Sequence, residues 1–255
     1  MGITEIRRIL KDGVDTPVEV DGDELVAEDG WRVPIHEAHH LPPVRPTKIL
    51  CVHLNHISRV REFQTTLPAA PTYFHKPVSS LNRHLGDVVR PERCRWLNYE
   101  GEVVIVIGQP CRNIDPTEAG HYIGGYTIGN DFGLHDFRDT DAGSMLRVKG
   151  SDTLCPVGPG IVSGWDFHGK RIRTLVNGEV AQDGTTDEMT WDMHYLVADL
   201  ARTITLFPGD LIFSGTPANS RPVEPGDLVT VEVEGLGGLT NRIVSGENPI
   251  PDDCG

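Results

Sequence analysis

Two glutamates, Glu100 and Glu102, stand at the start of an unbroken apolar run, 103–107, that Gly108 closes. Such a run predicts a strand buried on both faces, and because side chains alternate along a strand, the two carboxylates point the same way. Buried neighbouring carboxylates repel each other unless a cation, shared protons or solvent relieves them. Asp131 follows a second apolar run, 122–128, and could add a third carboxylate. Three hard oxygen ligands favour Mg²⁺, Mn²⁺ or Ca²⁺ over zinc. The simpler alternative to a metal site is that the two glutamates lie at a strand end exposed to solvent.

The elements that position these residues are predicted to be mostly strands, in a mixed α/β, β-dominated fold. Residues 1–46 predict a small β-rich N-terminal domain, with a hairpin at Asp21-Gly22 and a proline-spaced linker over 41–46. Residues 47–255 are assigned to a larger catalytic domain. Its local signals are a helix start at Asp115, a hairpin at Asn177-Gly178, an amphipathic helix over about 191–204, Pro-Gly-Asp turns at 208–210 and 225–227, and a loose tail from Ser245.

Composition and charge narrow the class of protein. The 255 residues carry a formal net charge of −14, which argues against nucleic acid and anionic membrane surfaces as partners and favours a small-molecule substrate. No run of about eighteen apolar residues predicts a transmembrane helix, and the N-terminus lacks the apolar core of a signal peptide. The five cysteines are scattered without a C-x-x-C pair, so we expect reduced thiols and a cytoplasmic location.

Several motifs over about 47–244 together resemble the fumarylacetoacetate hydrolase family in order and spacing. Motifs found in a shared context are far more specific than any one of them. The matching segments are Tyr99-Glu100-Gly101-Glu102, Gly129-Asn130-Asp131, Lys149-Gly150-Ser151-Asp152, Val176-Asn177-Gly178-Glu179, and Pro208-Gly209-Asp210 leading to Gly215-Thr216-Pro217. The resemblance implies a β-roll-like catalytic domain that assembles as a homodimer or a dimer of dimers, and a segment over 50–70 that orders over bound substrate.

The resemblance also implies roles for particular residues. Glu100, Glu102 and Asp131 match the family's ligands for Mg²⁺ or Mn²⁺, Lys149 matches a lysine beside the metal, and the Gly215-Thr216 segment matches the binding site of the substrate carboxylate. Family substrates are 2-oxo acids or their enols. A divalent ion that holds such an acid acts as a Lewis acid and stabilises the enolate, and a nearby ammonium adds to this effect. Outside this motif, Lys149 would be read as an ordinary surface lysine.

One segment, 55–62, departs from the family's hydrolases, which carry Asn-Tyr-x-x-His-x-x-Glu there. Arg59 stands at the histidine position, and an arginine cannot act as a general base. Activation of water would then fall to Glu62, His53 or His56, although both histidines could equally be structural. His135 and Arg59 are expected to bind substrate. His135 stands where relatives often have an arginine, which leaves open how a distal substrate carboxylate is held; Arg59, Arg138 or Arg147 could hold it.

The pattern Leu54-Asn55-His56-x-Ser58 and the stretch 173–244 are similar to the family's bifunctional isomerase/decarboxylase branch. That branch acts on substrates of the 2-hydroxyhepta-2,4-diene-1,7-dioate type in aromatic-compound catabolism and needs no activated water. We therefore expect a metal-dependent isomerase or decarboxylase. One alternative is an acylpyruvate- or fumarylpyruvate-type hydrolase or an oxaloacetate decarboxylase. Another is an inactive metabolite-binding or assembly subunit, against which the intact acidic cluster argues.

Overall fold

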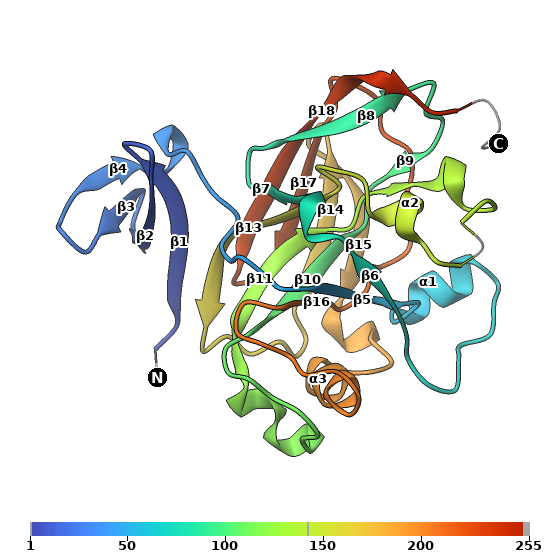
Figure 1. The fold of residues 1–255 in the computed structure, drawn as a ribbon, viewed down its shortest axis with the longest axis horizontal. Helices are drawn as coiled ribbons and strands as arrows, with labels where there is room; N and C mark the ends of the chain where they lie inside the picture. The colour runs from blue at the N-terminus through green and yellow to red at the C-terminus, as the bar shows by residue number, and fades with distance from the viewer. Residues whose placement is uncertain (1, 142, 252–255) are drawn as a thin grey trace.

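Two large β-sheets organise the computed structural model, which describes residues 2–141 and 143–251 (Figure 1). Within these residues, an eleven-stranded sheet has a continuous path and one side branch, β7 (Leu81–Arg83), which pairs with β13. The path runs β4 (Arg32–Pro34), β3 (Glu24–Ala27), β2 (Val14–Asp21), β1 (Thr4–Lys11), β13 (Cys155–Ser163), β11 (Ile123–Asn130), β10 (Gly101–Ile107), β16 (Leu211–Phe213), β5 (Ile49–His53) and β6 (Thr72–Lys76).

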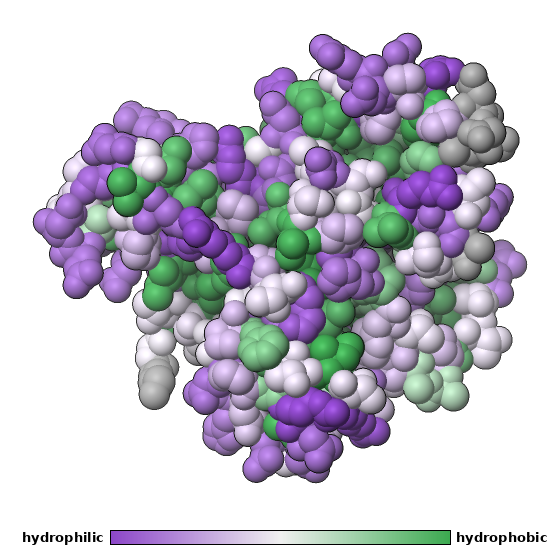
Figure 2. Space-filling model, in the orientation of Figure 1, coloured by the Kyte–Doolittle hydropathy of each residue, from purple (hydrophilic) through white to green (hydrophobic). Residues whose placement is uncertain are grey.

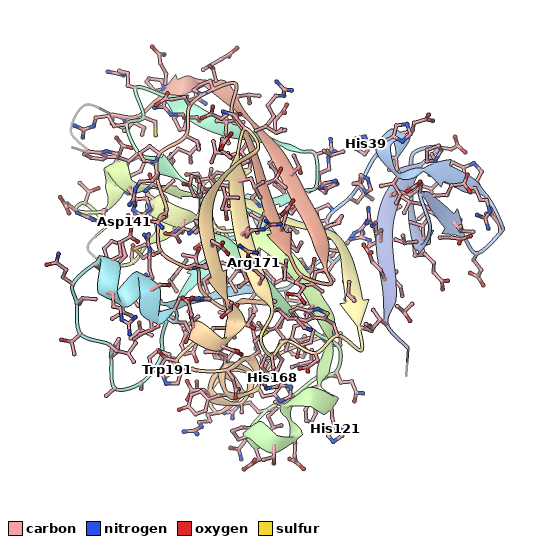
Figure 3. The ribbon with its side chains drawn as sticks, turned by 180° about the vertical axis from the view of Figure 1, so that it is seen from behind. His39, His121, Asp141, His168, Arg171 and Trp191 are labelled. Carbon is pink, nitrogen blue, oxygen red and sulfur yellow. The ribbon has the colours of Figure 1, made fainter. Side chains whose placement is uncertain are left out.

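The remaining strands form two smaller sheets. The five-stranded sheet, seen from behind in Figure 3 with Arg171 on it, contains β15 (Glu179–Thr185), β14 (Arg171–Val176), β17 (Leu228–Val233), β18 (Gly237–Pro249) and β8 (Asp87–Glu92). A short pair joins β12 (Gly133–Leu134) to β9 (Leu97–Asn98). The helices are α1 (Ile57–Glu62), α2 (Leu146–Lys149) and α3 (Met193–Ala201), with 3₁₀ turns η1 (Ile35–Glu37), η2 (Val78–Ser80), η3 (Pro116–His121), η4 (His135–Phe137) and η5 (Thr186–Glu188). Among the described residues, no helix is long and apolar enough to cross a membrane.

Strands make up most of the regular structure, so the predicted β-dominated fold class is confirmed.

Strand β10 is buried along its whole length, as its sequence predicts. Val103, Ile105 and Ile107 face a core shared with the five-stranded sheet and α3. Val104 and Val106 face a second core on the other side, with β5, β13 and β16. Full burial of such side chains contributes roughly 1.5–3 kcal/mol each, so the strand that carries the glutamates is held firmly in place.

The N-terminal strands β1 to β4 pack around their own small core of Ile9, Val18, Leu25 and Ala27. They stand apart from the rest of the chain in Figure 1, and the space-filling view shows apolar residues between this unit and the main body (Figure 2). The predicted hairpin at Asp21-Gly22 is present between β2 and β3. Antiparallel pairing of β1 with β13 joins the unit to the large sheet.

Most local predictions follow from short-range chemistry. Asn177 and Gly178 both have positive φ, at 52° and 86°, and form the predicted turn between β14 and β15. Helix α3 lies within the predicted range 191–204 and is capped by Asp192, whose carboxylate accepts a bond from the Tyr195 N–H. Asp115 caps the predicted helix start, but the helix there is the 3₁₀ turn η3.

The prediction of a loose tail from Ser245 is wrong. Strand β18 continues to Pro249 and pairs in parallel with β8, and the N–H of the buried Ile250 donates to the Glu92 carbonyl at 2.9 Å. Strand β8 is about 150 residues away in sequence, so the polar, glycine-containing tail shows no local sign of this pairing. Residues 252–255 lie outside the described residues.

Candidate metal centre and active site

The structure brings Glu100, Glu102 and Asp131 together, with one carboxylate oxygen from each lying within 4.8 Å of the others. Antiparallel pairing of β10 with β11 places Gly101 opposite Asn130, and so sets the glutamates beside the residue that follows β11. The Asp131 N–H donates to the Glu100 carbonyl at 2.8 Å, and the Asn130 side chain accepts from the Glu100 N–H at 2.9 Å. The backbone itself therefore fixes the spacing of the three carboxylates.

Lys149 lies against this cluster, at the end of α2. Its Nζ donates to Glu100 Oε2 at 2.6 Å and to the Asp131 carbonyl at 2.8 Å, and it is 2.9 Å from Asp131 Oδ2. Burial alone would lower the pKa of Lys149, but the two carboxylates outweigh it and raise the pKa above its ordinary value. The lysine that the motif singled out is thus a buried, charged partner of the cluster.

A second buried lysine, Lys76, was not predicted. Its side chain is 0 % exposed, and Nζ contacts Asp131 Oδ1 and donates to the Leu154 carbonyl at 2.9 Å. The sequence did hold a signal, because alternation along β6 places Lys76 on the same side as the buried Phe74. The Asp131 carboxylate is therefore held between two ammonium groups.

Glu102 has a different environment from Glu100. Burial raises the pKa of Glu100, but Lys149 and Arg59 reverse this and bring it to about 2. Burial, Asp131 and Glu100 together raise the pKa of Glu102 well above its usual range. Within the part of the chain that the structure describes, no lysine or arginine pairs with Glu102, and Oε2 accepts only the Gly215 N–H at 2.7 Å. A divalent ion would supply the missing positive charge to an all-oxygen donor set, so these residues fit Mg²⁺ or Mn²⁺.

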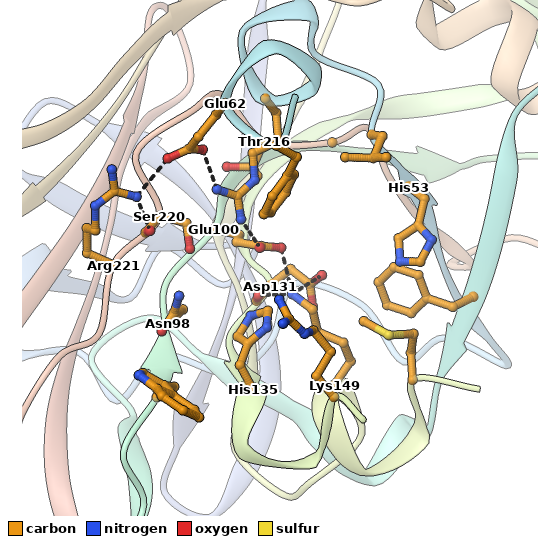
Figure 4. Close-up of a pocket in the computed structure, with 18 of the residues that line it drawn as sticks. His53, Glu62, Asn98, Glu100, Asp131, His135, Lys149, Thr216, Ser220 and Arg221 are labelled. Carbon is orange, nitrogen blue, oxygen red and sulfur yellow. Dashed lines mark hydrogen bonds and ion pairs between the residues drawn. The ribbon is translucent and has the colours of Figure 1, made fainter. Parts of the chain in front are cut away.

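The cluster lies in the wall of a cavity of about 1120 Å³ (Figure 4). Gly215 and Thr216, predicted to bind substrate, line it. Gly215 has φ +98°, and a Cβ there would lie 2.9 Å from the Asn55 Cβ, so only glycine can present its N–H to Glu102. The Thr216 hydroxyl donates to the Gly101 carbonyl at 3.0 Å and accepts from Gln182 Nε2 at 3.0 Å.

Arg59 connects the predicted acid–base segment to the cluster. Its guanidinium donates to Glu100 Oε1 at 3.0 Å and to Glu62. Glu62 also accepts from Arg221 at 2.7 Å and from the Asn219 N–H at 3.2 Å. Burial raises the pKa of Glu62, but Arg221 and Arg59 outweigh it and hold the pKa below its usual range. Glu62 is therefore an occupied ion-pair partner and a weak candidate for a base.

The three histidines singled out by the sequence, which are His53, His56 and His135, lie in different environments. His53 lines the cavity, with its ring 5.0 Å from that of Phe74. His135 also lines it, and burial, followed by Lys149, lowers its pKa to about 4. His56 is fully buried and is not among the residues that line the cavity. The prediction that His56 moves a proton is therefore corrected, because its ring cannot reach a molecule held there.

Two further residues of the predicted segments, Asn55 and Arg147, bond to other parts of the protein and do not line the cavity. Asn55 is fully buried and donates to the carbonyls of Trp191 and Ser214, at 2.9 Å and 2.8 Å. Arg147 pairs with Asp141 at 3.2 Å and is not among the cavity-lining residues, in contrast to Arg138 and Arg59. The prediction that Arg147 could hold a distal substrate carboxylate is therefore corrected.

The chain is similar to known proteins in both sequence and structure. The family model for the fumarylacetoacetate (FAA) hydrolase C-terminal domain matches residues 48–244. A solved structure of 5-carboxymethyl-2-hydroxymuconate delta-isomerase from Mycobacterium smegmatis is 33% identical, with a TM-score of 0.88 over 96% of this chain and 100% of that one. A 4-hydroxyphenylacetate degradation bifunctional isomerase/decarboxylase from Salmonella dublin is 37% identical over 78% of this chain and 47% of its own length, so the match spans about half of that relative. A mitochondrial oxaloacetate tautomerase from Homo sapiens is 34% identical over 83% of this chain and 71% of its own length.

Proposed function

Since the chain belongs to the fumarylacetoacetate hydrolase family, we propose that it is a divalent-metal-dependent isomerase or decarboxylase of unsaturated 2-oxo or 2-hydroxy dicarboxylates. The observation that carries this proposal is the cluster of Glu100, Glu102 and Asp131 beside Lys149, open to a cavity large enough for such an acid. The isomerase named among the solved structures and the isomerase/decarboxylase among the relatives support the same reaction class.

The described residues divide the chemistry between them. A divalent ion, when bound, would polarise the oxygen next to the reacting carbon and favour the enol form of the substrate. The Lys149 ammonium, held by Glu100 and Asp131, would stabilise negative charge that develops beside it. Burial and then Lys149 lower the pKa of both His53 and His135, so both rings are neutral near pH 7 and either could accept a substrate proton.

A hydrolase is less consistent with this site. The family's hydrolases activate water with a His-Glu pair in the segment that matches 55–62, and neither of the two residues at those positions here is a free base. Arg59 stays protonated, and the Glu62 carboxylate is bound by two arginines. Oxaloacetate tautomerisation is the second candidate, because a relative with that name is 34% identical over 83% of this chain and the reaction is the same enol chemistry.

Proton NMR in D₂O tests the proposal directly. The protein with Mg²⁺ is offered a 2-hydroxy-2,4-dienedioate, an acylpyruvate and oxaloacetate, each with and without EDTA. We expect deuterium uptake, double-bond migration or loss of CO₂ in the first, abolished by EDTA and by Glu102→Gln, which removes the charge at nearly constant size.

Other products would redirect the assignment. Pyruvate and a free acid from the acylpyruvate would establish a hydrolase, and exchange in oxaloacetate alone would establish a tautomerase. A protein that binds Mg²⁺ and changes none of the three would be a binding or assembly subunit. Dimer assembly and the division of the chain near residue 46 stay predictions, to be tested by light scattering and by expressing 47–255 alone.

A further inference from the structure

One wall of the cavity carries polar groups that the metal-centre chemistry does not use. We propose that Asn98, Ser220 and Arg221 form a second subsite, which binds the distal carboxylate of the substrate and selects dianions over monoanions. This inference rests on the proposed function and names the residues that bind the second carboxylate of its substrate. Figure 4 shows the three residues gathered on one side of Glu100, opposite His53.

Two of these residues present buried polar atoms without partners. Among the described residues, Ser220 Oγ and Asn98 Oδ1 have no hydrogen-bond partner, although both residues line the cavity and Ser220 is only 4 % exposed. Leaving such atoms unpaired is costly, so native proteins rarely do so without a ligand or water to complete them. The Ser220 hydroxyl can donate to a carboxylate, which would complete its unpaired oxygen. Asn98 can donate through its NH₂ group, whereas its unpaired Oδ1 is an acceptor that water, and not a carboxylate, would complete.

The backbone holds these residues next to each other. Asn98 forms an isolated β-bridge with Pro222, and the Val223 N–H donates to the Leu97 carbonyl at 3.0 Å. This pairing ties β9 to the segment that carries Ser220 and Arg221. The subsite is therefore built by two paired segments and does not depend on one mobile side chain.

Arg221 supplies the charge. Its Nη1 donates to Glu62 Oε1 at 2.7 Å and to the Ser220 carbonyl at 2.8 Å. Among the described residues, Nη2 makes only a long contact, 3.4 Å, to Asn219 Oδ1. Glu62 thus fixes the guanidinium through one nitrogen and leaves donors on the others. A guanidinium anchored in this way is suited to a carboxylate, which it can bind through two parallel N–H donors.

The charges around the cavity fit a dianion. Within the described residues, its walls carry five lysine and arginine side chains and six carboxylates, and the buried Lys76 behind Asp131 makes the two signs equal. A divalent ion in the acidic cluster adds two positive charges. A dicarboxylate restores neutrality, and a monoanionic 2-oxo acid leaves one positive charge without a partner.

The test compares two acids of equal chain length, 2-oxoheptanedioate and 2-oxoheptanoate, by calorimetric titration of the Mg²⁺-loaded protein. We expect the diacid to bind roughly 10–100-fold more tightly, in the range of one charge-assisted hydrogen-bond network. Arg221→Gln and Ser220→Ala should each remove most of this preference while leaving monoacid binding within about threefold. Arg138→Gln tests the competing candidate for the distal carboxylate, because Arg138 is an exposed arginine of the same cavity that contacts Asp139 instead of Glu62; the subsite predicts that this variant keeps the preference.

Each outcome decides the question. Equal binding of the two acids by the wild-type protein, or an unchanged preference in Arg221→Gln, would overturn the subsite while the proposed function stands. Loss of preference in Arg138→Gln alone would place the distal carboxylate elsewhere and also overturn it. Failure of both acids to bind, with no turnover of the dienedioate, would instead remove the proposed function. Should Arg221→Gln fold poorly, Ser220→Ala and the wild-type comparison still give the answer.

Discussion

Replacing Lys76 with methionine removes one charge from behind the acidic cluster and keeps the length and apolar stem of the side chain. Lys76 is fully buried, and its ammonium contacts Asp131 Oδ1 and the Leu154 carbonyl. The substitution leaves the Asp131 carboxylate buried with Lys149 as its remaining cation. Truncating one partner of a buried ion pair costs about 3–5 kcal/mol, and we expect Lys76→Met to lose an amount at the lower end because Lys149 still compensates.

The same change should weaken metal binding. Lys76 adds positive charge near the site, which opposes the binding of a cation, but its contact with Oδ1 also orients the Asp131 carboxylate. Groups that orient a metal ligand in this way typically contribute 10–100-fold to affinity, so we expect the Mn²⁺ dissociation constant of Lys76→Met to rise by roughly that factor. Calorimetric titration with Mn²⁺ gives the constant, and urea unfolding gives the stability.

Two comparisons isolate the effect. Lys48→Met breaks another ion pair with a buried carboxylate, that of Asp210, away from the cavity. It should lower stability and leave Mn²⁺ affinity unchanged. In an Asp131→Asn background, Lys76→Met should change Mn²⁺ affinity little further, because the group that it orients is gone. Unchanged or tighter Mn²⁺ binding by the single variant would refute the orienting role and show that the repulsive charge dominates.

Three other changes have definite expected outcomes. Asn55→Ala removes the side-chain hydrogen bonds to the Trp191 and Ser214 carbonyls and should cost about 1–3 kcal/mol in urea unfolding; a smaller loss would mean that water replaces the amide. Arg59→His should create some acylpyruvate cleavage, detected as pyruvate, because Glu62 loses an ion-pair partner and gains a neighbouring imidazole; no gain would show that other residues set the reaction class. The pKa of Glu62 is lower in the folded protein, so its ion pairs contribute stability above about pH 4.5 that is lost as the pH falls through the folded value. Glu62→Gln should therefore make the free energy of unfolding depend less steeply on pH below about pH 4.5. An equal slope in both proteins would argue against the ion pairs.

Much of the site was predictable because its signals are local. The unbroken apolar run behind Glu102 and the alternation of side chains along a strand place both glutamates at the mouth of a buried strand, and β10 is that strand. The Asn177-Gly178 hairpin follows from the positive φ angles that only a few residue types accept. Asp131 needed one further step, the antiparallel pairing of β10 with β11.

The features that were not predicted depend on contacts between distant segments. Lys76 reaches Asp131 across 55 positions of sequence, and its burial depends on a partner that local pattern does not reveal. The ordered end of β18 needs β8 beside it. His56 and His53 are three residues apart, and only the turn after β5 decides which of them faces the cavity.

The central claim is that Glu100, Glu102 and Asp131 hold a divalent ion. Titration of the protein with Mn²⁺, followed by the loss of the free-ion electron paramagnetic resonance signal, tests it most directly. We expect one site per chain, displaced by Mg²⁺, and a loss of at least about 100-fold in affinity in Glu102→Gln with the fold retained, because two carboxylates cannot replace three. Absence of a stoichiometric site in the folded wild-type protein, or undiminished binding in Glu102→Gln, would contradict the account.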